Sequence, residues 1–137
     1  MTVADLQEQA TLNLRISGRL SALREGVARL RAAREQLQST MEGTNLTDHA
    51  ETMKVVEALT GIENALVQTG EGKIGAQLKP MLQRQLTYLY DMTTSADQKP
   101  GRDAYLRLTD IERSLAAHLF ALQQILDHEV PVLLGTH

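Results

Sequence analysis

One apolar stripe near the start of the chain constrains the fold more than any other feature of the sequence. Between residues 5 and 41, aliphatic side chains recur at steps of three and four residues: Leu12, Ile16, Leu20, Leu23, Val27, Leu30, Leu37 and Met41. This spacing places them on one face of an α-helix. A helix over 5–41 would be about 55 Å long at 1.5 Å per residue. It needs partners along that length, so the stripe predicts a helical bundle.

Three further helices are predicted by the same periodicity, over residues 48–69, 79–94 and 102–129. Asp48 and Glu51 have the spacing of a capping box at the start of the first of them. Pro80 suits the first turn of the second. Pro131 is expected to close or kink the last helix, because proline has no N–H for the helical hydrogen-bond pattern.

These three helices also carry apolar seams. The side chains expected in the core are Met53, Val56, Leu59, Ile62 and Leu66; Leu82, Leu86, Leu89 and Met92; and Leu108, Ile111, Leu115, Leu119, Leu122, Ile125 and Leu126. Short connections favour antiparallel neighbours. We therefore predict that residues 1–137 form a single all-α domain, an up-and-down antiparallel bundle of four helices. A three-helix core with a broken second segment also fits the pattern.

Charge and composition exclude several classes of protein. The net charge of −3 creates no field that would attract nucleic acid. No apolar run approaches the roughly 18 residues that cross a bilayer, so membrane insertion is not expected. The sequence has no Cys, which removes disulfides, thiolate metal sites and cysteine nucleophiles together. No signal peptide is recognisable at the N-terminus.

No catalytic, cofactor or metal site is predicted. Di-iron sites in bundles use Glu-x-x-His, but apolar residues stand three positions before His49, His118 and His128. His118 falls on the apolar stripe of its helix, and we interpret it as a residue of the core or its edge rather than a phosphate acceptor. The segment 70–74 lacks the first glycine and the final Ser or Thr of a phosphate-binding loop.

The first helix is locally basic, with Arg15, Arg19, Arg24, Arg29, Arg31 and Arg34. These arginines flank the apolar stripe on both sides and no aromatic residue accompanies them, so we predict ion pairs with acids of other helices rather than a nucleic-acid surface. Arg34 differs from the rest, because it lies in the centre of the stripe between Leu30 and Leu37. A charge there must be paired or must reach the rim. We predict a buried or half-buried ion pair of Arg34 that fixes the register of the helices.

The chain also resembles a known family segment. The residues that carry the resemblance are Leu30, Arg31, Arg34, Gln36 and Leu37; Leu59, Ile62, Glu63 and Leu66; Leu82, Leu86 and Leu89; Ser95–Asp97, Pro100 and Tyr105; and Leu126–Val130. From Ala4 to Leu133, the chain is similar to the helical C-terminal region that follows the β-propeller in bacterial proteins with sialidase-like (BNR) or sortilin-like repeats, often classed as glycosyl hydrolases. The resemblance implies the C-terminal domain of a longer secreted or periplasmic protein, with any catalytic residue in the propeller.

The function expected from these observations is a non-catalytic helical module for interaction or oligomerisation, appended to a sialidase-like propeller. Its partner would be that propeller or a second copy of the chain, and neither nucleic acid nor a small-molecule ligand is expected. The alternative is a ligand-sensing bundle of a periplasmic or extracellular receptor, with Tyr88, Tyr90 and Tyr105 around its pocket. An enzyme would need two carboxylates with perturbed pKa values, for which Glu63 and Glu112 are the candidates.

Overall fold

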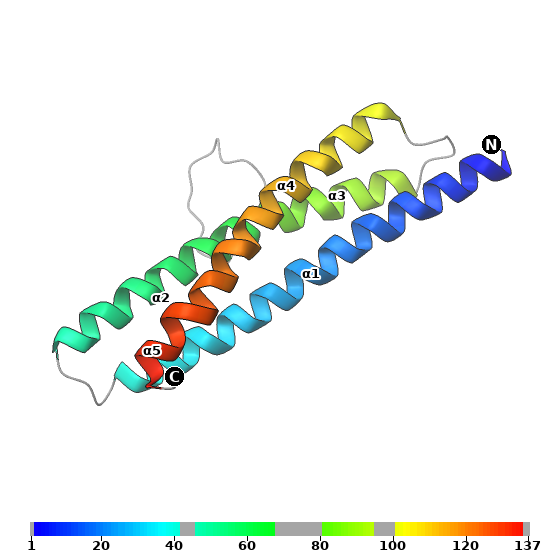
Figure 1. The fold of residues 1–137 in the computed structure, drawn as a ribbon. Helices are drawn as coiled ribbons and strands as arrows, with labels where there is room; N and C mark the ends of the chain where they lie inside the picture. Colours follow the sequence, from blue (N-terminus) through cyan, green and yellow to red (C-terminus); the bar gives the residue numbers. More distant parts are fainter. Residues whose placement is uncertain (1, 42–45, 68–80, 95–100, 136–137) are drawn as a thin grey trace.

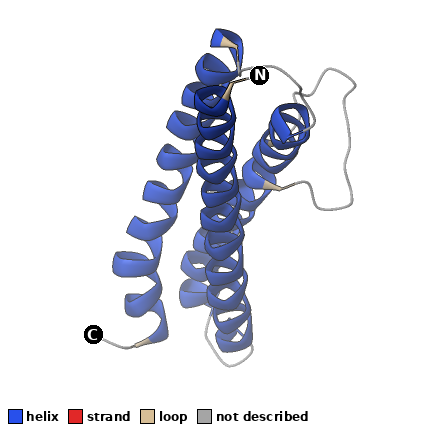
Figure 2. Ribbon diagram, turned by 90° about the vertical axis from the view of Figure 1, so that its right-hand side faces the viewer, coloured by secondary structure: helices blue, strands red, loops and turns tan. Residues whose placement is uncertain are grey.

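The computed structural model describes residues 2–41, 46–67, 81–94 and 101–135. Its four main helices are α1 (Val3–Met41), α2 (Leu46–Leu66), α3 (Leu82–Thr94) and α4 (Arg102–Gln124). The described residues contain no strand, and the four helices pack against one another (Figure 1 and Figure 2), which confirms the predicted all-α fold class. α2 begins at Leu46, ahead of the two residues predicted to cap it. The segments between the described helices, 42–45, 68–80 with Pro80, and 95–100, lie outside the described residues.

The two shorter helices lie in line along α1. Glu63, near the end of α2, bonds to Arg34 in the second half of α1, whereas Thr93, at the end of α3, bonds to Gln9 near the start of α1. Val67 and Gln83 both line a hollow beside the middle of α1, between these two points. Both helices therefore run opposite to α1, one after the other (Figure 1).

Helix lengths account for this arrangement. At 1.5 Å per residue, the 21 residues of α2 and the 13 residues of α3 together span about 51 Å. The 39 residues of α1 span about 58 Å. Neither short helix could bury the whole apolar stripe of α1, and the two in line nearly do so.

α4 runs parallel to α1 along its length. Tyr105 bonds to Glu8, Glu112 to Arg15, and Gln123 to Arg29, so the residue numbers rise together on the two helices. A cross-section of the bundle therefore cuts α1, α4 and either α2 or α3. This is the three-helix core with a broken second segment that the sequence left open. The reversal of direction expected between the second and third helices does not occur.

The core is aliphatic and follows the predicted stripes closely. Fully buried side chains include Leu12, Ile16, Leu23, Leu30, Leu37, Leu59, Leu66, Leu86, Leu89, Leu108 and Leu122. The prediction was wrong for Met53 and Met92, which are 43% and 41% exposed, while the preceding Thr52 and the following Thr93 are buried. Thr93 is tolerated there because its Oγ1 donates to Asn13 and its carbonyl accepts a hydrogen bond from Gln9.

Pro131 does not end the last helix, which continues to Leu134. After α4 the chain forms a π-helical turn, Ile125–Glu129, and then α5, Val130–Leu134, with Pro131 in its first turn. In a regular helix the proline ring would clash with the carbonyl four residues earlier. In the π turn, the Val130 N–H instead bonds to the carbonyl of Ile125, five residues back. The wider turn accommodates Pro131 without ending the helix.

Candidate functional site

Arg34 lies against Glu63, the one charged residue that is buried among those described, at 3% exposure. Arg34 donates to the two carboxylate oxygens at 2.7 and 3.2 Å, and Arg31 donates at 2.6 Å. The hydrogen bonds from Arg34, and secondarily those from Arg31, lower the pKa of Glu63 although desolvation acts to raise it. The Arg34 side chain is 20% exposed, so this is a half-buried ion pair. Its role in register stays a prediction.

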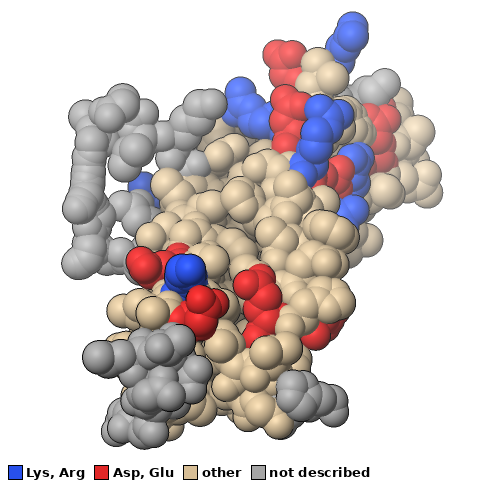
Figure 3. All heavy atoms as spheres, turned by 60° about the vertical axis from the view of Figure 1, so that its left-hand side comes forward, with Lys and Arg blue, Asp and Glu red and all other residues tan. Residues whose placement is uncertain are grey.

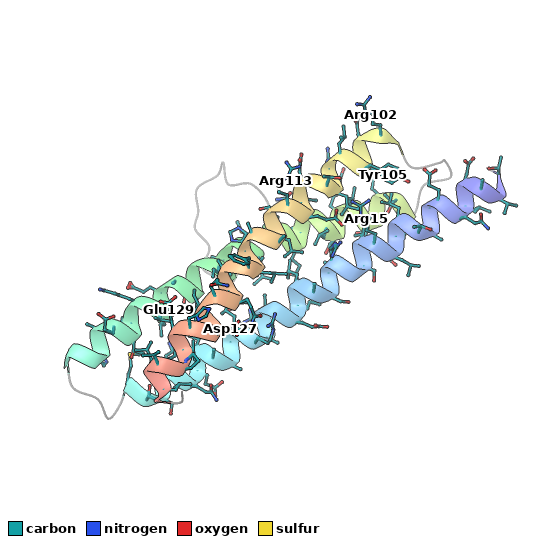
Figure 4. All side chains as sticks on the ribbon, viewed as in Figure 1. Arg15, Arg102, Tyr105, Arg113, Asp127 and Glu129 are labelled. Carbon is teal, nitrogen blue, oxygen red and sulfur yellow. The ribbon has the colours of Figure 1, made fainter. Side chains whose placement is uncertain are left out.

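A second cluster of the same kind joins α1 to α4. Glu112 accepts hydrogen bonds from Arg15 at 2.5 and 2.9 Å and from Arg19 at 2.8 Å. The bonds from Arg15, and then those from Arg19, lower the pKa of Glu112 to about 2. Beside this cluster, the Tyr105 hydroxyl donates to Glu8 at 2.8 Å (Figure 4 labels Arg15 and Tyr105). Burial, and then the bond to Glu8, raises the pKa of Tyr105.

Glu63 and Glu112 do not form a catalytic pair. Their arginine partners Arg31 and Arg15 are about 24 Å apart along α1 at 1.5 Å per residue. A general acid at neutral pH needs a raised pKa, whereas both of these carboxylates have a lowered one. What the arrangement can do is hold α2 and α4 against α1 by charge-assisted hydrogen bonds.

The three tyrosines considered for a ligand pocket lie in different places. Tyr88 lines an open groove of about 890 Å³ between α3 and α4. Tyr90 packs against the core, and Tyr105 faces Glu8 on α1. The groove carries charges of both signs, from Arg84, Asp91, Arg107 and Asp110.

The histidines and the possible phosphate loop give no site. His118 is half-buried at the edge of the core, and His49 and His128 are exposed. Segment 70–74 lies outside the described residues. Within the described ranges, no three His, Asp or Glu side chains come together as metal ligands.

The second half of α4 and the start of the π turn present an uncharged exposed face. Residues 114–126 contain no Asp, Glu, Lys or Arg, although 23% of the chain is charged. Phe120, the single Phe of the sequence, is 67% exposed in this stretch. Ala116, Ala117 and Ala121 around it are exposed as well. Figure 3 shows uncharged surface over the middle of the molecule, with charged side chains gathered toward its two ends.

Two opposite charges bound this face, one in α4 and one in the π turn after it, and Figure 4 labels both. Arg113 lies seven residues before Phe120 and Asp127 seven residues after it, and both side chains are exposed. We refer to Arg113, Ala116, Ala117, Phe120, Ala121, Gln124 and Asp127 together as the α4 face. The apolar seam pattern did not predict this face. The signal that could have found it is an aromatic residue off the apolar seam within a charge-free stretch.

No family model matches the chain, and no similar protein was found among curated proteins or solved structures. In the part of the chain that the structure describes, none of the helices is both long enough and apolar enough to span a membrane.

Proposed function

We propose that this chain is a non-catalytic protein-interaction module that docks through the α4 face. The observation that carries the proposal is Phe120, which exposes 67% of its surface at the centre of a stretch without charge. Fully burying such a side chain stabilises a complex by about 1.5–3 kcal/mol. Interface cores are depleted of charged residues, and their energetic centres are enriched in aromatic ones.

An exposed apolar residue by itself would support nothing, because single exposed apolar side chains are common on soluble proteins. Here the ring stands among three small exposed alanines, where a partner can approach the helix closely. The core does not need Phe120, since the buried side of α4 is filled by Leu108, Ile111, Leu115 and Leu122. The α4 face is therefore available for a partner without a cost to the fold.

The contacts of Glu63 and Glu112 support a structural role, because two arginines of α1 hold each carboxylate and join α1 to a second helix. The family resemblance extends the proposal to a module of a longer secreted or periplasmic protein that also contains a sialidase-like propeller. That propeller is then one candidate partner of the α4 face.

Site-specific photo-crosslinking tests this function. The photoreactive amino acid p-benzoylphenylalanine replaces Phe120 in one preparation and Leu14 in a matched control. Leu14 is 74% exposed on α1, away from the α4 face. Each protein is irradiated alone and in an extract of the cells from which it comes. We expect protein adducts from position 120 and none of comparable yield from position 14. If position 120 gives no adduct in either setting, the proposed function is wrong.

The α3–α4 groove keeps ligand sensing as a second candidate. Its charges of both signs next to Tyr88 would suit a zwitterionic molecule such as a free amino acid. The melting temperature is measured with each free amino acid in excess, for the unchanged chain and for Tyr88→Ala. A rise that Tyr88→Ala abolishes supports sensing, and the absence of any rise rejects it for this class of ligand.

A further inference from the structure

We propose that the partner of the α4 face is a second copy of this chain. The two copies pack with their α4 helices antiparallel about Phe120, so that Arg113 of each copy lies opposite Asp127 of the other. This inference rests on the proposed function of that face and specifies who occupies it.

The spacing of the face is self-complementary. Arg113 and Asp127 lie at equal distances in sequence on either side of Phe120, Arg113 in α4 and Asp127 in the π turn that follows it, and both side chains are exposed. A two-fold interface uses the same patch on both copies, so residue 120 − k of one copy meets residue 120 + k of the other. With k = 7, this rule pairs the positive Arg113 with the negative Asp127, and it does so twice.

Charge also selects the direction and register of this pairing. Parallel α4 helices in register would bring Arg113 beside Arg113 and Asp127 beside Asp127. An antiparallel pair shifted by three residues would bring Asp110 opposite the partner's Asp127. Like charges placed together across an interface cost several kcal/mol. The antiparallel pairing centred on Phe120 is the one that these three charges favour.

Both charged side chains are free to turn toward a partner. Arg113 Nη1 and Asp110 Oδ1 are 4.0 Å apart, and each side chain is 79% exposed, so their attraction within one copy is weak. The Asp127 carboxylate accepts a hydrogen bond from Gln123 at 2.8 Å, which leaves its second oxygen for an arginine.

The centre of the interface is formed by the two rings. The Phe120 side chains of the two copies meet at the two-fold axis, where an offset stack contributes about 0.5–1.5 kcal/mol beyond burial. Ala117 and Ala121 flank each ring and leave it room. One turn further out, Ala116 faces the partner's Gln124.

The size of the face predicts a weak dimer. From Arg113 to Asp127 the face is about 21 Å long, and a contact strip about 10 Å wide gives it an area of roughly 210 Å² per copy. Stable interfaces bury about 800 Å² per partner. The dimer should therefore form at high protein concentration, or where a longer parent protein brings two copies together.

Charge exchange followed by sedimentation equilibrium tests the pairing. The mass of the full chain is measured from about 5 μM to about 1 mM, a range that covers weak association. We expect it to rise from the monomer mass of 15.2 kDa toward twice that value.

Arg113→Asp and Asp127→Arg should each weaken association at least about tenfold, because each creates two like-charge contacts. An equimolar mixture of the two variants should associate again, since both of its contacts join opposite charges. Leu14→Ser is the control and should associate like the unchanged chain, and circular dichroism confirms that every variant is helical.

Each result decides one of the two proposals. A chain that stays monomeric up to about 1 mM, or variants that associate no better mixed than alone, overturns the antiparallel pairing. Adducts from position 120 that form only in cell extract, and never at twice the chain mass in the purified protein, overturn the second copy but leave the proposed function standing. If Leu14→Ser weakens association and Arg113→Asp does not, the contact between copies lies on α1 and the antiparallel pairing is overturned.

Discussion

Replacing Arg34 with Met tests how the buried end of α2 is held. Arg34 makes two hydrogen bonds to Glu63, at 2.7 and 3.2 Å, and Glu63 is 3% exposed. Without Arg34, the carboxylate keeps the hydrogen bond from Arg31, but it is too buried for water to replace the two hydrogen bonds that it loses. We expect Arg34→Met to destabilise the fold.

The magnitude follows from the geometry. Hydrogen bonds to charged groups contribute about 1.5–3 kcal/mol each. Because Arg34 is 20% exposed and Arg31 remains in place, we take the combined loss at about 3 kcal/mol. The methionine recovers about 1 kcal/mol by burying apolar surface at the same position. The net expectation is a loss of about 2 kcal/mol, or a fall of about 6 °C in melting temperature for a chain of this size.

The assay is urea unfolding followed by circular dichroism at neutral pH. Arg24→Met, an exposed position on the same helix, is the matched control and should change stability by less than about 0.5 kcal/mol. The double variant Arg34→Met with Glu63→Met removes the buried charge together with its partner, so it should recover the lost stability. If the pair fixes register, amide NMR spectra of the double variant will show more than one set of peaks. An Arg34→Met protein that is as stable as the unchanged chain and gives one set of peaks refutes both the energetic and the register argument.

Other features of the fold give further predictions. The lowered pKa of Glu112, about 2 against an ordinary 4.5, contributes stability above pH 4.5 that is lost as the pH falls toward 2. Because its arginine partners are partly exposed, this loss should be roughly 1–2 kcal/mol, and urea midpoints measured against pH should change less for Glu112→Gln. Gly18→Ala should stabilise α1 by about 0.5–1 kcal/mol, since nothing lies within 4 Å of the added carbon. Gly26→Ala should be about 1 kcal/mol less stable than Gly18→Ala, because its Cβ would stand 2.6 Å from a Leu119 methyl. Equal melting temperatures for the two variants would contradict this account of the α1–α4 contact.

The periodicity of the sequence predicted the helices and most of their buried side, but the direction of α3 needed one further argument. Short connections favour a reversal of the chain, and this rule predicts that α3 runs opposite to α2. That rule takes no account of helix length, and the apolar stripe of α1 is longer than either α2 or α3. Summing the lengths of α2 and α3 gives nearly the length of α1, so the in-line arrangement was within reach of the sequence.

The errors at Met53 and Met92 have a different cause. Apolar patterns assume that a threonine is less suited to the core than a neighbouring methionine. Thr93 is buried because Asn13 and Gln9, on a helix far away in sequence, satisfy its hydroxyl and carbonyl. No local pattern contains that information. Arg34 was easier to find, because a charge in the centre of an apolar stripe requires a partner wherever that partner comes from.

The charges of this molecule have two different roles, and the difference makes the proposed interface testable. Arg15, Arg19, Arg31 and Arg34 are bound to glutamates across helix contacts, so changing them alters the stability of the fold. Arg113 in α4 and Asp127 in the π turn are both exposed, and among the described residues they bond to Asp110 and Gln123, which are close to them in sequence. Changing them should leave the unfolding free energy within about 0.5 kcal/mol of the unchanged chain. A variant of Arg113 or Asp127 that loses association at unchanged stability therefore reports on the contact between copies, and one that unfolds the chain would show that the α4 face belongs to the fold itself.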